Sequence, residues 1–251
     1  MIQSQVEDGV RLLTLDRPGA LNAFTTGQFE RLAALMLEAR EDSATRVVVL
    51  TGNGRAFSAG ADLREDRPPA DELEYGFEGC VDILIDFPKP LVLAINGIGV
   101  GVGATICGLA DMAFIAQSAR LRCPFSALGL TAEACSTYTF PRLMGHQAAA
   151  RFLMSAHWMD ANECRAAGLV TDVFPDEGFL ATVMTQAAAL AKLPMASLLE
   201  TKALMLAGHR DAMKLANKRE NEGLRRLRNG PAHTEAVAAF KQKRDPDFST
   251  F

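Results

Sequence analysis

The sequence feature that most constrains the fold is an apolar stretch running from Leu91 to Ala110. At about 20 residues it is long enough to raise the question of a membrane-spanning helix. The stretch nevertheless contains Asn96 and five glycines, and its pattern changes at Asn96-Gly97. A buried strand, a turn and a buried helix fit this pattern better than a span does. We therefore expect no membrane partner.

The bulk composition predicts one main domain. A chain of 251 residues, 49% hydrophobic and 22% charged, can bury a single sizeable core. Its formal net charge of -4 gives no general electrostatic reason to bind nucleic acid. We therefore expect no nucleic-acid partner.

The five cysteines favour a reducing compartment. They are odd in number, widely spaced and form no C-x-x-C pair with histidine partners, which argues against a disulfide scaffold and a zinc site. Residues 1–19 have neither an apolar signal stretch with a basic start nor the Arg-rich character of a transit peptide. We expect a cytoplasmic protein without a metal site.

Strands and helices alternate along the N-terminal part of the chain, which favours an α/β fold. The expected elements are the strands Ile2–Val6 and Val10–Leu15, the helix Gln28–Arg40, the strand Arg46–Thr51, the helix Leu73–Asp86, the strand Pro90–Ile95, the helix Gly103–Ala110 and the strand Met112–Ala116. Residues 64–74 are polar and carry two prolines, so we expect an exposed or mobile segment that contributes to a pocket wall.

Beyond about Pro141 the pattern becomes mainly helical. The expected helices are Gly145–Ser155, Asp160–Ala167, Phe179–Lys192, Pro194–Ala207, Asp211–Arg228 and Pro231–Gln242, with one strand at Leu169–Phe174. Asp160 and Gly168 are suitable caps for the second helix. We place the boundary between the core and a C-terminal helical region at residues 190 and 191.

Three segments concentrate residues suited to chemistry, although each also has a purely structural interpretation. Residues 57–62 follow a glycine-rich break, where backbone N–H groups can point at a ligand, but they also suit a tight turn. Residues 96–103 precede a helix N-terminus and allow close backbone approach, yet close helix–strand packing explains the same glycines. Their spacing is not the G-x-G-x-x-G of a dinucleotide loop.

The third segment is centred on Glu133, whose neighbours are small and apolar. Desolvation raises the pKa of a carboxyl group and makes it a better base. An isolated glutamate is more often solvated at the surface, so composition alone leaves both alternatives open.

Ordered motifs in these segments resemble those of the crotonase (enoyl-CoA hydratase/isomerase) superfamily. They are Asp16-Arg17-Pro18-x-Ala20-Leu21-Asn22-Ala23, then Phe57-Ser58-Ala59-Gly60-Ala61-Asp62-Leu63, then Ala94-Ile95-Asn96-Gly97 with its glycine series and Asp111. The resemblance implies an α/β fold with a crotonase-like spiral of repeated ββα units over residues 1–190. It also implies a helical C-terminal trimerisation region over residues 191–251.

Carried over position by position, the resemblance implies an oxyanion hole formed by the backbone N–H groups of Ala61 and Val102. It further implies an acyl-CoA thioester as the partner, in a homotrimer or a dimer of trimers. The residues expected to bind CoA and substrate are Ala23, Ala59, Gly60, Asp62, Leu63 and Gly101.

The positions that match the two catalytic glutamates of the hydratases hold Thr105 and Phe125 here. Neither side chain can transfer the proton of an attacking water. The stretch around Glu133 is instead similar to the Δ3,Δ2-enoyl-CoA isomerases of the peroxisomal type, whose matching glutamate is the sole catalytic base. Ala132 and Ala134 replace the proline and glycine that usually flank it.

The resemblance therefore implies an isomerase that moves the double bond of a 3-enoyl-CoA to give the 2-enoyl-CoA. Glu133 is the expected base, and no cofactor is expected beyond the coenzyme A of the substrate itself. The alternatives are enoyl-CoA hydration or other acyl-CoA thioester chemistry on the same fold, and a non-catalytic acyl-CoA-binding protein.

Overall fold

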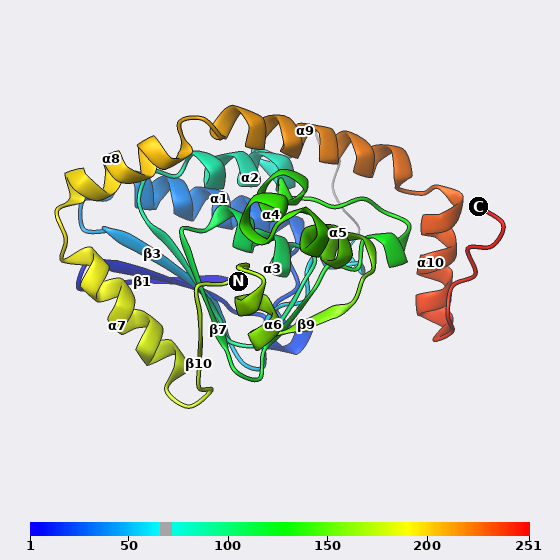
Figure 1. The fold of residues 1–251 in the computed structure, drawn as a ribbon, viewed down its shortest axis with the longest axis horizontal. Helices are drawn as coiled ribbons and strands as arrows, with labels where there is room; N and C mark the ends of the chain where they lie inside the picture. The colour runs from blue at the N-terminus through cyan, green and yellow to red at the C-terminus, as the bar shows by residue number, and fades with distance from the viewer. Residues whose placement is uncertain (66–71) are drawn as a thin grey trace.

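Two β-sheets form the centre of the computed structural model, which describes residues 1–65 and 72–251 (Figure 1). Within these residues the large sheet has six strands in the order β1-β2-β3-β5-β7-β10, and the small sheet has four in the order β4-β6-β8-β9. The large sheet comprises β1 (Ile2–Glu7), β2 (Val10–Leu15), β3 (Val47–Gly52), β5 (Leu91–Ile95), β7 (Met112–Ala116) and β10 (Asp172–Phe174). The small sheet comprises β4 (Ala56–Ser58), β6 (Ile98–Val100), β8 (Arg120–Arg122) and β9 (Trp158–Asp160).

The chain passes from one sheet to the other in each repeat. The consecutive pairs β3 and β4, β5 and β6, and β7 and β8 each place one strand in either sheet. Parallel pairing then stacks β3, β5 and β7 in the large sheet and β4, β6 and β8 in the small one. This arrangement is the expected spiral of repeated units, and the β1–β2 hairpin extends the edge of its large sheet.

Helices cover both faces of the large sheet. Figure 1 shows α1 (Thr26–Glu41) and α2 (Gly76–Asp86) above the sheet and α7 (Phe179–Ala191) below it. Every residue of β3 and β5 is buried. Continuous burial explains why these strands are runs of apolar residues rather than alternating polar and apolar ones.

Local sequence determines where α1 begins. The Thr25 side chain accepts a hydrogen bond from the Gln28 amide, and the Gln28 side chain accepts one from the Thr25 amide. This reciprocal capping box satisfies two donors that a helix N-terminus leaves unpaired. The helix then buries an apolar stripe against the sheet, comprising Phe29, Leu32, Ala33, Leu35, Met36 and Ala39.

The remaining α-helices are α3 (Val102–Thr105), α4 (Ser136–Met144), α5 (His146–Met154), α6 (Ala161–Ala166), α8 (Met195–Leu206), α9 (Arg210–Leu227) and α10 (Pro231–Gln242). Within the described residues, 3-10 helices are formed by η1 (Pro18–Ala20), η3 (Ile106–Leu109) and η4 (Ser126–Leu128). The C-terminal helices predicted from periodicity are confirmed to within two residues at each end. Asp160 caps α6 as expected, and Gly168 follows the helix with a φ of +81°.

The structure corrects several local predictions. The helix expected at Gly103–Ala110 is the short helix α3 followed by η3, and the last strand of the large sheet covers only Asp172–Phe174. The helix α4 and all four strands of the small sheet were not predicted from the sequence. Those strands have three residues each, which is too short to establish a period of two.

No single helix in the described parts of the chain is long and apolar enough to cross a membrane. Only α7 and α8 taken together reach that length and composition, and they are bent by 101° at their junction.

An ion pair between a buried lysine and a more exposed aspartate connects the C-terminal helices to the large sheet. Lys202 of α8 is 6% exposed, and its Nζ donates to Asp111 Oδ2 at 2.6 Å and to the Lys89 carbonyl at 2.9 Å. Asp111 Oδ2 also accepts a hydrogen bond from the Leu91 amide at 2.7 Å. Burial lowers the pKa of Lys202, and the neighbouring Asp111 opposes that shift. The ammonium group therefore depends on Asp111 for its charge compensation.

We predict that Asp111→Asn lowers the free energy of unfolding by about 3 kcal/mol, because it leaves the buried Lys202 ammonium uncompensated. Urea denaturation followed by circular dichroism measures this change. The matched control is Asp172→Asn in the exposed pair with Arg165, for which we expect a loss below about 1 kcal/mol. Equal losses in the two variants would contradict the role assigned to Asp111.

Candidate active site

Two glycine-containing turns come together where the chain leaves the small sheet. Gly60 follows β4 and has a φ of +86°, and Gly101 follows β6 and has a φ of +55°. A Cβ placed on Gly60 would lie 2.7 Å from the Val100 carbonyl oxygen and 3.7 Å from Gly101 Cα. Only glycine allows this approach without strain, because both the backbone angle and the space exclude a side chain.

Each turn is followed by a backbone amide that points to no acceptor. The amides of Gly60, Asp62 and Gly101 donate to Ser58 Oγ, to the Phe24 carbonyl and to the Arg122 carbonyl. In contrast, the amides of Ala61 and Val102 donate no hydrogen bond among the residues that the structure describes. Val102 is also the first residue of α3, where helix geometry leaves N–H groups unpaired. Two unpaired donors on adjoining turns can bind one oxyanion.

The Glu133 carboxylate lies beside these turns. A Cβ placed on Gly101 would be 3.5 Å from Glu133 Oε1 and 3.8 Å from Gly60 Cα. The Glu133 side chain is partly buried, and its charge contributes to raising the pKa of the Cys123 thiol after the larger effect of burial. The structure therefore brings Glu133, Gly60 and Gly101 into one place, although they are up to 73 residues apart in the sequence.

The turn after Glu133 has an unusual backbone. Ala134 and Cys135 have φ values of +57° and +51°, in the left-handed region that costs an L-residue about 1–2 kcal/mol. Ala134 occupies the position that is usually glycine in the isomerases it resembles, and it adopts a conformation in which glycine is favoured. The replacement leaves the turn strained but leaves the Glu133 carboxylate beside Gly101.

The two positions that correspond to hydratase glutamates contain no proton carrier. Thr105 is fully buried, and its hydroxyl donates to the Gly101 carbonyl one turn earlier. Phe125 is 5% exposed and belongs to the hydrophobic core. At these positions the chain provides packing and helix hydrogen bonding.

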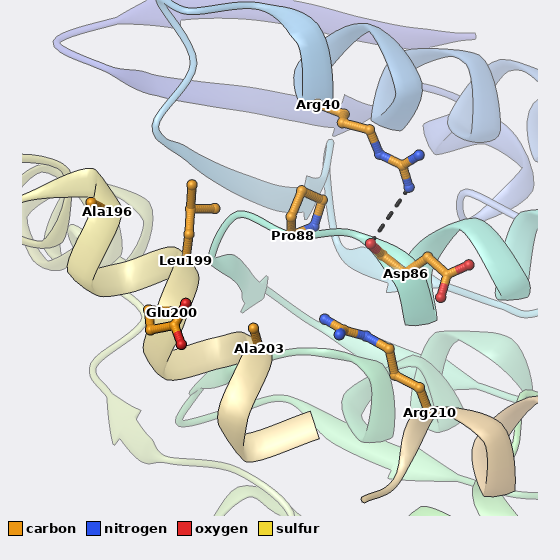
Figure 2. Close-up of a pocket in the computed structure, with 8 residues that line it drawn as sticks. All are labelled: Arg40, Asp86, Pro88, Ala196, Leu199, Glu200, Ala203 and Arg210. Carbon is orange, nitrogen blue, oxygen red and sulfur yellow. Dashed lines mark hydrogen bonds between the residues drawn. The ribbon is translucent and has the colours of Figure 1, made fainter. Parts of the chain in front are cut away.

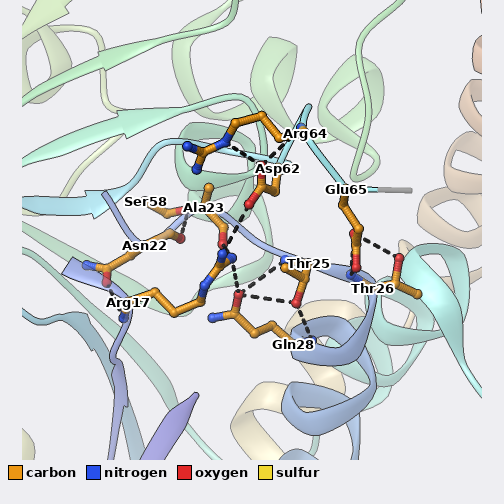
Figure 3. A network of polar contacts seen from close by, with 10 residues as sticks. All are labelled: Arg17, Asn22, Ala23, Thr25, Thr26, Gln28, Ser58, Asp62, Arg64 and Glu65. Carbon is orange, nitrogen blue, oxygen red and sulfur yellow. Dashed lines mark hydrogen bonds and ion pairs between the residues drawn. The ribbon is translucent and has the colours of Figure 1, made fainter. Parts of the chain in front are cut away.

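The Asp62 side chain belongs to a network that connects two of the motifs (Figure 3). Arg17 donates to Asp62 Oδ2 at 3.1 Å, and the Arg64 amide donates to Oδ1 at 3.1 Å. The Arg64 hydrogen bond is the largest of the effects that lower the pKa of Asp62. Ser58 Oγ meanwhile donates to the Asn22 carbonyl at 2.9 Å. The network positions the turn that bears Ala61, and both Asp62 oxygens are engaged within the chain.

The other expected CoA-binding residues lie near the same turns but differ in exposure. Ala23 is buried, and its carbonyl accepts from Arg17 at 2.8 Å. Ala59 is partly buried and donates to the Leu21 carbonyl. Leu63 is 56% exposed. Most of the segment 64–74, expected to be exposed and to form part of the pocket wall, lies outside the described residues.

A cavity of about 720 Å³ lies elsewhere on the molecule (Figure 2). Its walls come from the ends of α1 and α2 and from α8 and α9, and they include Arg40, Asp86, Pro88, Leu199, Glu200 and Arg210. None of the expected site residues lines it. The two turns and Glu133 are the better candidate site, because chemistry requires converging polar groups rather than volume.

Thiol and metal chemistry find no support in the described residues. All five cysteines are buried, and burial raises the pKa of Cys80 and Cys107 to about 12. No group of three His, Cys, Asp or Glu side chains within residues 1–65 and 72–251 could hold a metal ion.

The sequence reading missed Glu220, a buried glutamate of α9 that reaches the turn after Glu133. The sequence of its helix is rich in lysine and arginine, which is typical of a helix face exposed to solvent. However, Met213, Asn217, Glu220 and Leu224 recur at spacings of three and four residues, which places Glu220 on the buried face. That spacing is the feature of the sequence that could have predicted the burial of Glu220.

We predict that Gly60→Ala lowers the free energy of unfolding by at least about 2 kcal/mol, since it combines a left-handed backbone with a clash against Val100. Gly19→Ala is the control, because a Cβ there meets no described atom within 4 Å. Thermal unfolding of both variants provides the comparison. A Gly60→Ala protein as stable as Gly19→Ala would mean that the two turns are not in close contact.

We also predict that the folded protein resists thiol reagents at pH 8. A pKa of about 12 leaves about one thiol in ten thousand ionised at that pH, and only the thiolate is nucleophilic. Titration with a chromogenic disulfide should show little reaction in buffer and five thiols in 6 M guanidinium. Rapid reaction of any thiol in buffer would show that it is more accessible than the structure indicates.

The chain resembles known proteins over nearly its whole length. Residues 5–250 match the family model for enoyl-CoA hydratase/isomerase. The chain is 36% identical to enoyl-CoA delta isomerase 2 of Homo sapiens over 95% of its own length and 62% of that protein, so it spans about six tenths of this relative. It is 32% identical to the 2,3-dehydroadipyl-CoA hydratase of Escherichia coli over 95% of this chain and 94% of that protein.

Solved structures with a similar fold come from the same family. The crystal structure of an enoyl-CoA hydratase/isomerase from Pseudoalteromonas atlantica T6c superposes with a TM-score of 0.94, at 31% identity, over 98% of this chain and 99% of that chain. The spiral of two sheets with C-terminal helices is therefore the crotonase fold. Since the family model covers nearly the whole sequence, the chain belongs to the enoyl-CoA hydratase/isomerase family.

Proposed function

We propose that this chain is a Δ3,Δ2-enoyl-CoA isomerase, which converts a 3-enoyl-CoA to the trans-2-enoyl-CoA. The observation that supports it most directly is the position of the Glu133 carboxylate beside Gly60 and Gly101, the residues before the unpaired amides of Ala61 and Val102. One base next to two oxyanion donors suits the movement of a proton within an acyl thioester.

In the proposed reaction the thioester oxygen accepts hydrogen bonds from the Ala61 and Val102 amides. Glu133 removes a proton from C2, which lies between the carbonyl group and the alkene. The electron pair spreads over an extended dienolate whose charge collects on the thioester oxygen. Glu133 then returns the proton to C4, and the double bond moves into conjugation. Atoms and electrons balance within the substrate, so the proposed reaction needs no cofactor.

Both parts of the site are needed for a useful rate. Removing one oxyanion donor typically costs about 3–4 kcal/mol of transition-state stabilisation, and a positioned general base contributes about 10²–10⁴-fold. Because backbone amides form the proposed oxyanion hole, the side chain of Val102 does not interfere with it.

The residues favour isomerisation over hydration. Adding water to a 2-enoyl thioester requires a group to activate the water, and Thr105 and Phe125 stand where the hydratases have their glutamates. The chain resembles relatives named as isomerases and relatives named as hydratases, including the human isomerase and the Escherichia coli hydratase. The residues at the site are therefore the better guide to the reaction.

The assembly follows from family resemblance alone. We propose a homotrimer or a dimer of trimers, with an acyl-CoA thioester as the bound partner. Sedimentation velocity would determine the number of subunits.

We predict that Glu133→Gln lowers kcat for the isomerisation of 3-hexenoyl-CoA by about 10²–10⁴-fold, since the amide cannot accept the C2 proton. Appearance of the conjugated product, followed by ultraviolet absorbance, measures the rate. Binding of a saturated acyl-CoA, measured by calorimetry, should change little, because the oxyanion donors belong to the backbone.

The control is Glu177→Gln, which makes the same substitution at an exposed position before α7 and should leave kcat unchanged. If wild-type protein forms no conjugated product but hydrates 2-hexenoyl-CoA, the chain is a hydratase. If both reactions are absent and Glu133→Gln changes nothing, the chain binds acyl-CoA without catalysis.

A further inference from the structure

Glu220 on helix α9 is a buried carboxylate that the proposed reaction does not use. It is 4% exposed, and burial raises its pKa although its hydrogen bonds oppose the shift. An ionised carboxylate in such a place is costly unless several donors surround it. Its partners all lie in the segment that follows Glu133.

Three donors converge on this carboxylate. The Cys135 amide donates to Glu220 Oε2 at 2.7 Å. The Thr137 amide and the Thr137 hydroxyl donate to Oε1 at 2.9 and 2.6 Å. Both oxygens are therefore bound to residues that lie two and four positions after Glu133, and charge-assisted bonds of this kind are the stronger ones in proteins.

The segment needs an acceptor from outside. Cys135 is the N-cap of α4, and its side chain makes no capping hydrogen bond in the described structure. A capping box normally supplies one acceptor to an amide in the first turn and another to the amide of the cap itself. Glu220 supplies both from a different helix, and its negative charge suits the positive end of the α4 dipole.

A further buried polar residue, Asn217, connects α9 to α2. Asn217 is fully buried, and its Nδ2 donates to the Glu78 carbonyl at 3.1 Å and to Asp82 Oδ1 at 2.9 Å. Asn221 Nδ2 in turn donates to Asn217 Oδ1 at 2.9 Å. The two Asn217 bonds hold α9 against α2, the Asn221 bond lies within α9, and Glu220 faces the start of α4.

Gly223 brings the same helix close to the other side of the turn. A Cβ placed on Gly223 would lie 2.9 Å from Thr131 Cγ2. The face of α9 that bears Glu220 therefore contacts the chain both before and after Glu133. The strained pair Ala134 and Cys135 lies between these contacts, and such conformations persist where the surroundings hold them.

We propose that Glu220 is a positioning residue for Glu133: from α9 it holds the left-handed turn that keeps the Glu133 carboxylate beside the turn of Gly101, within reach of the proposed substrate. This inference rests on the proposed isomerase function. It makes α9 part of the support of the active site, even though Glu220 touches no reacting atom.

The test is Glu220→Gln, which preserves the size of the side chain and removes its charge. The amide oxygen can still accept from Thr137, but the amide NH2 then faces the Cys135 N–H, and two donors cannot pair. We expect kcat for 3-hexenoyl-CoA to fall about 10- to 100-fold, because small displacements of a catalytic group carry costs of that order. KM should change by less than about threefold, since the backbone amides remain in place.

A second readout does not depend on the reaction. Hydrogen exchange followed by mass spectrometry should show faster exchange in peptides that contain Cys135 and Thr137, and unchanged exchange in the β1–β2 hairpin. Glu222→Gln is the matched control: it makes the same substitution two positions further along α9, where the side chain points to another face. It should alter neither readout.

The outcomes separate the two proposals. Unchanged exchange in Glu220→Gln, or faster exchange with unchanged kcat, overturns the positioning role while the isomerase assignment stands. Faster exchange in a chain whose wild-type form isomerises no 3-enoyl-CoA overturns the proposed function and supports Glu220 as the group that holds the turn. If Glu220→Gln does not fold, Thr137→Val removes the hydroxyl donor alone and should still give a smaller loss of kcat and faster local exchange.

Discussion

The close approach of two turns, one after β4 and one after β6, is the constraint on which the site depends. Parallel pairing of β4 with β6 brings Gly60 against Val100 and Gly101, and the missing side chains let the backbones meet. The next amides, of Ala61 and Val102, then have no acceptor within the described chain. A fold that alternates strands between two sheets thus produces this pair of donors from backbone geometry alone. The side chains at the site, such as Glu133, supply the remaining chemistry.

The parts of the fold that could be predicted from sequence are the strands with continuous apolar runs and the long helices with a regular apolar repeat. Strands such as β3 are buried on both faces, and the helices from α7 onward repeat apolar residues over several turns. The small sheet could not be found, because its three-residue strands have no period. The helix α4 was missed for a different reason: its N-cap is Cys135, whose side chain makes no capping hydrogen bond, and the helix contains Pro141. Its start is stabilised from α9, and local sequence does not reveal such a contact.

The same distinction applies to the site. The glycines before Ala61 and Val102 stand in recognisable motifs, so the sequence indicated both amides together with Glu133. The sequence could not show that the Asp62 carboxylate is already engaged by Arg17 and Arg64, because that depends on how two distant segments pack. A motif identifies positions with a shared backbone role more reliably than it identifies what each side chain binds.

Buried polar groups explain why the helix α9 would matter for catalysis. Apolar contacts are non-directional, whereas the hydrogen bonds of Asn217 and Glu220 require one orientation of α9. Leaving such groups unpaired costs more than the bonds themselves contribute. This penalty sets the rotation of α9 and thereby the place of the acceptor for Cys135 and Thr137. A single helix orientation thus limits the motion of the turn that bears Glu133, about 85 residues earlier in the chain.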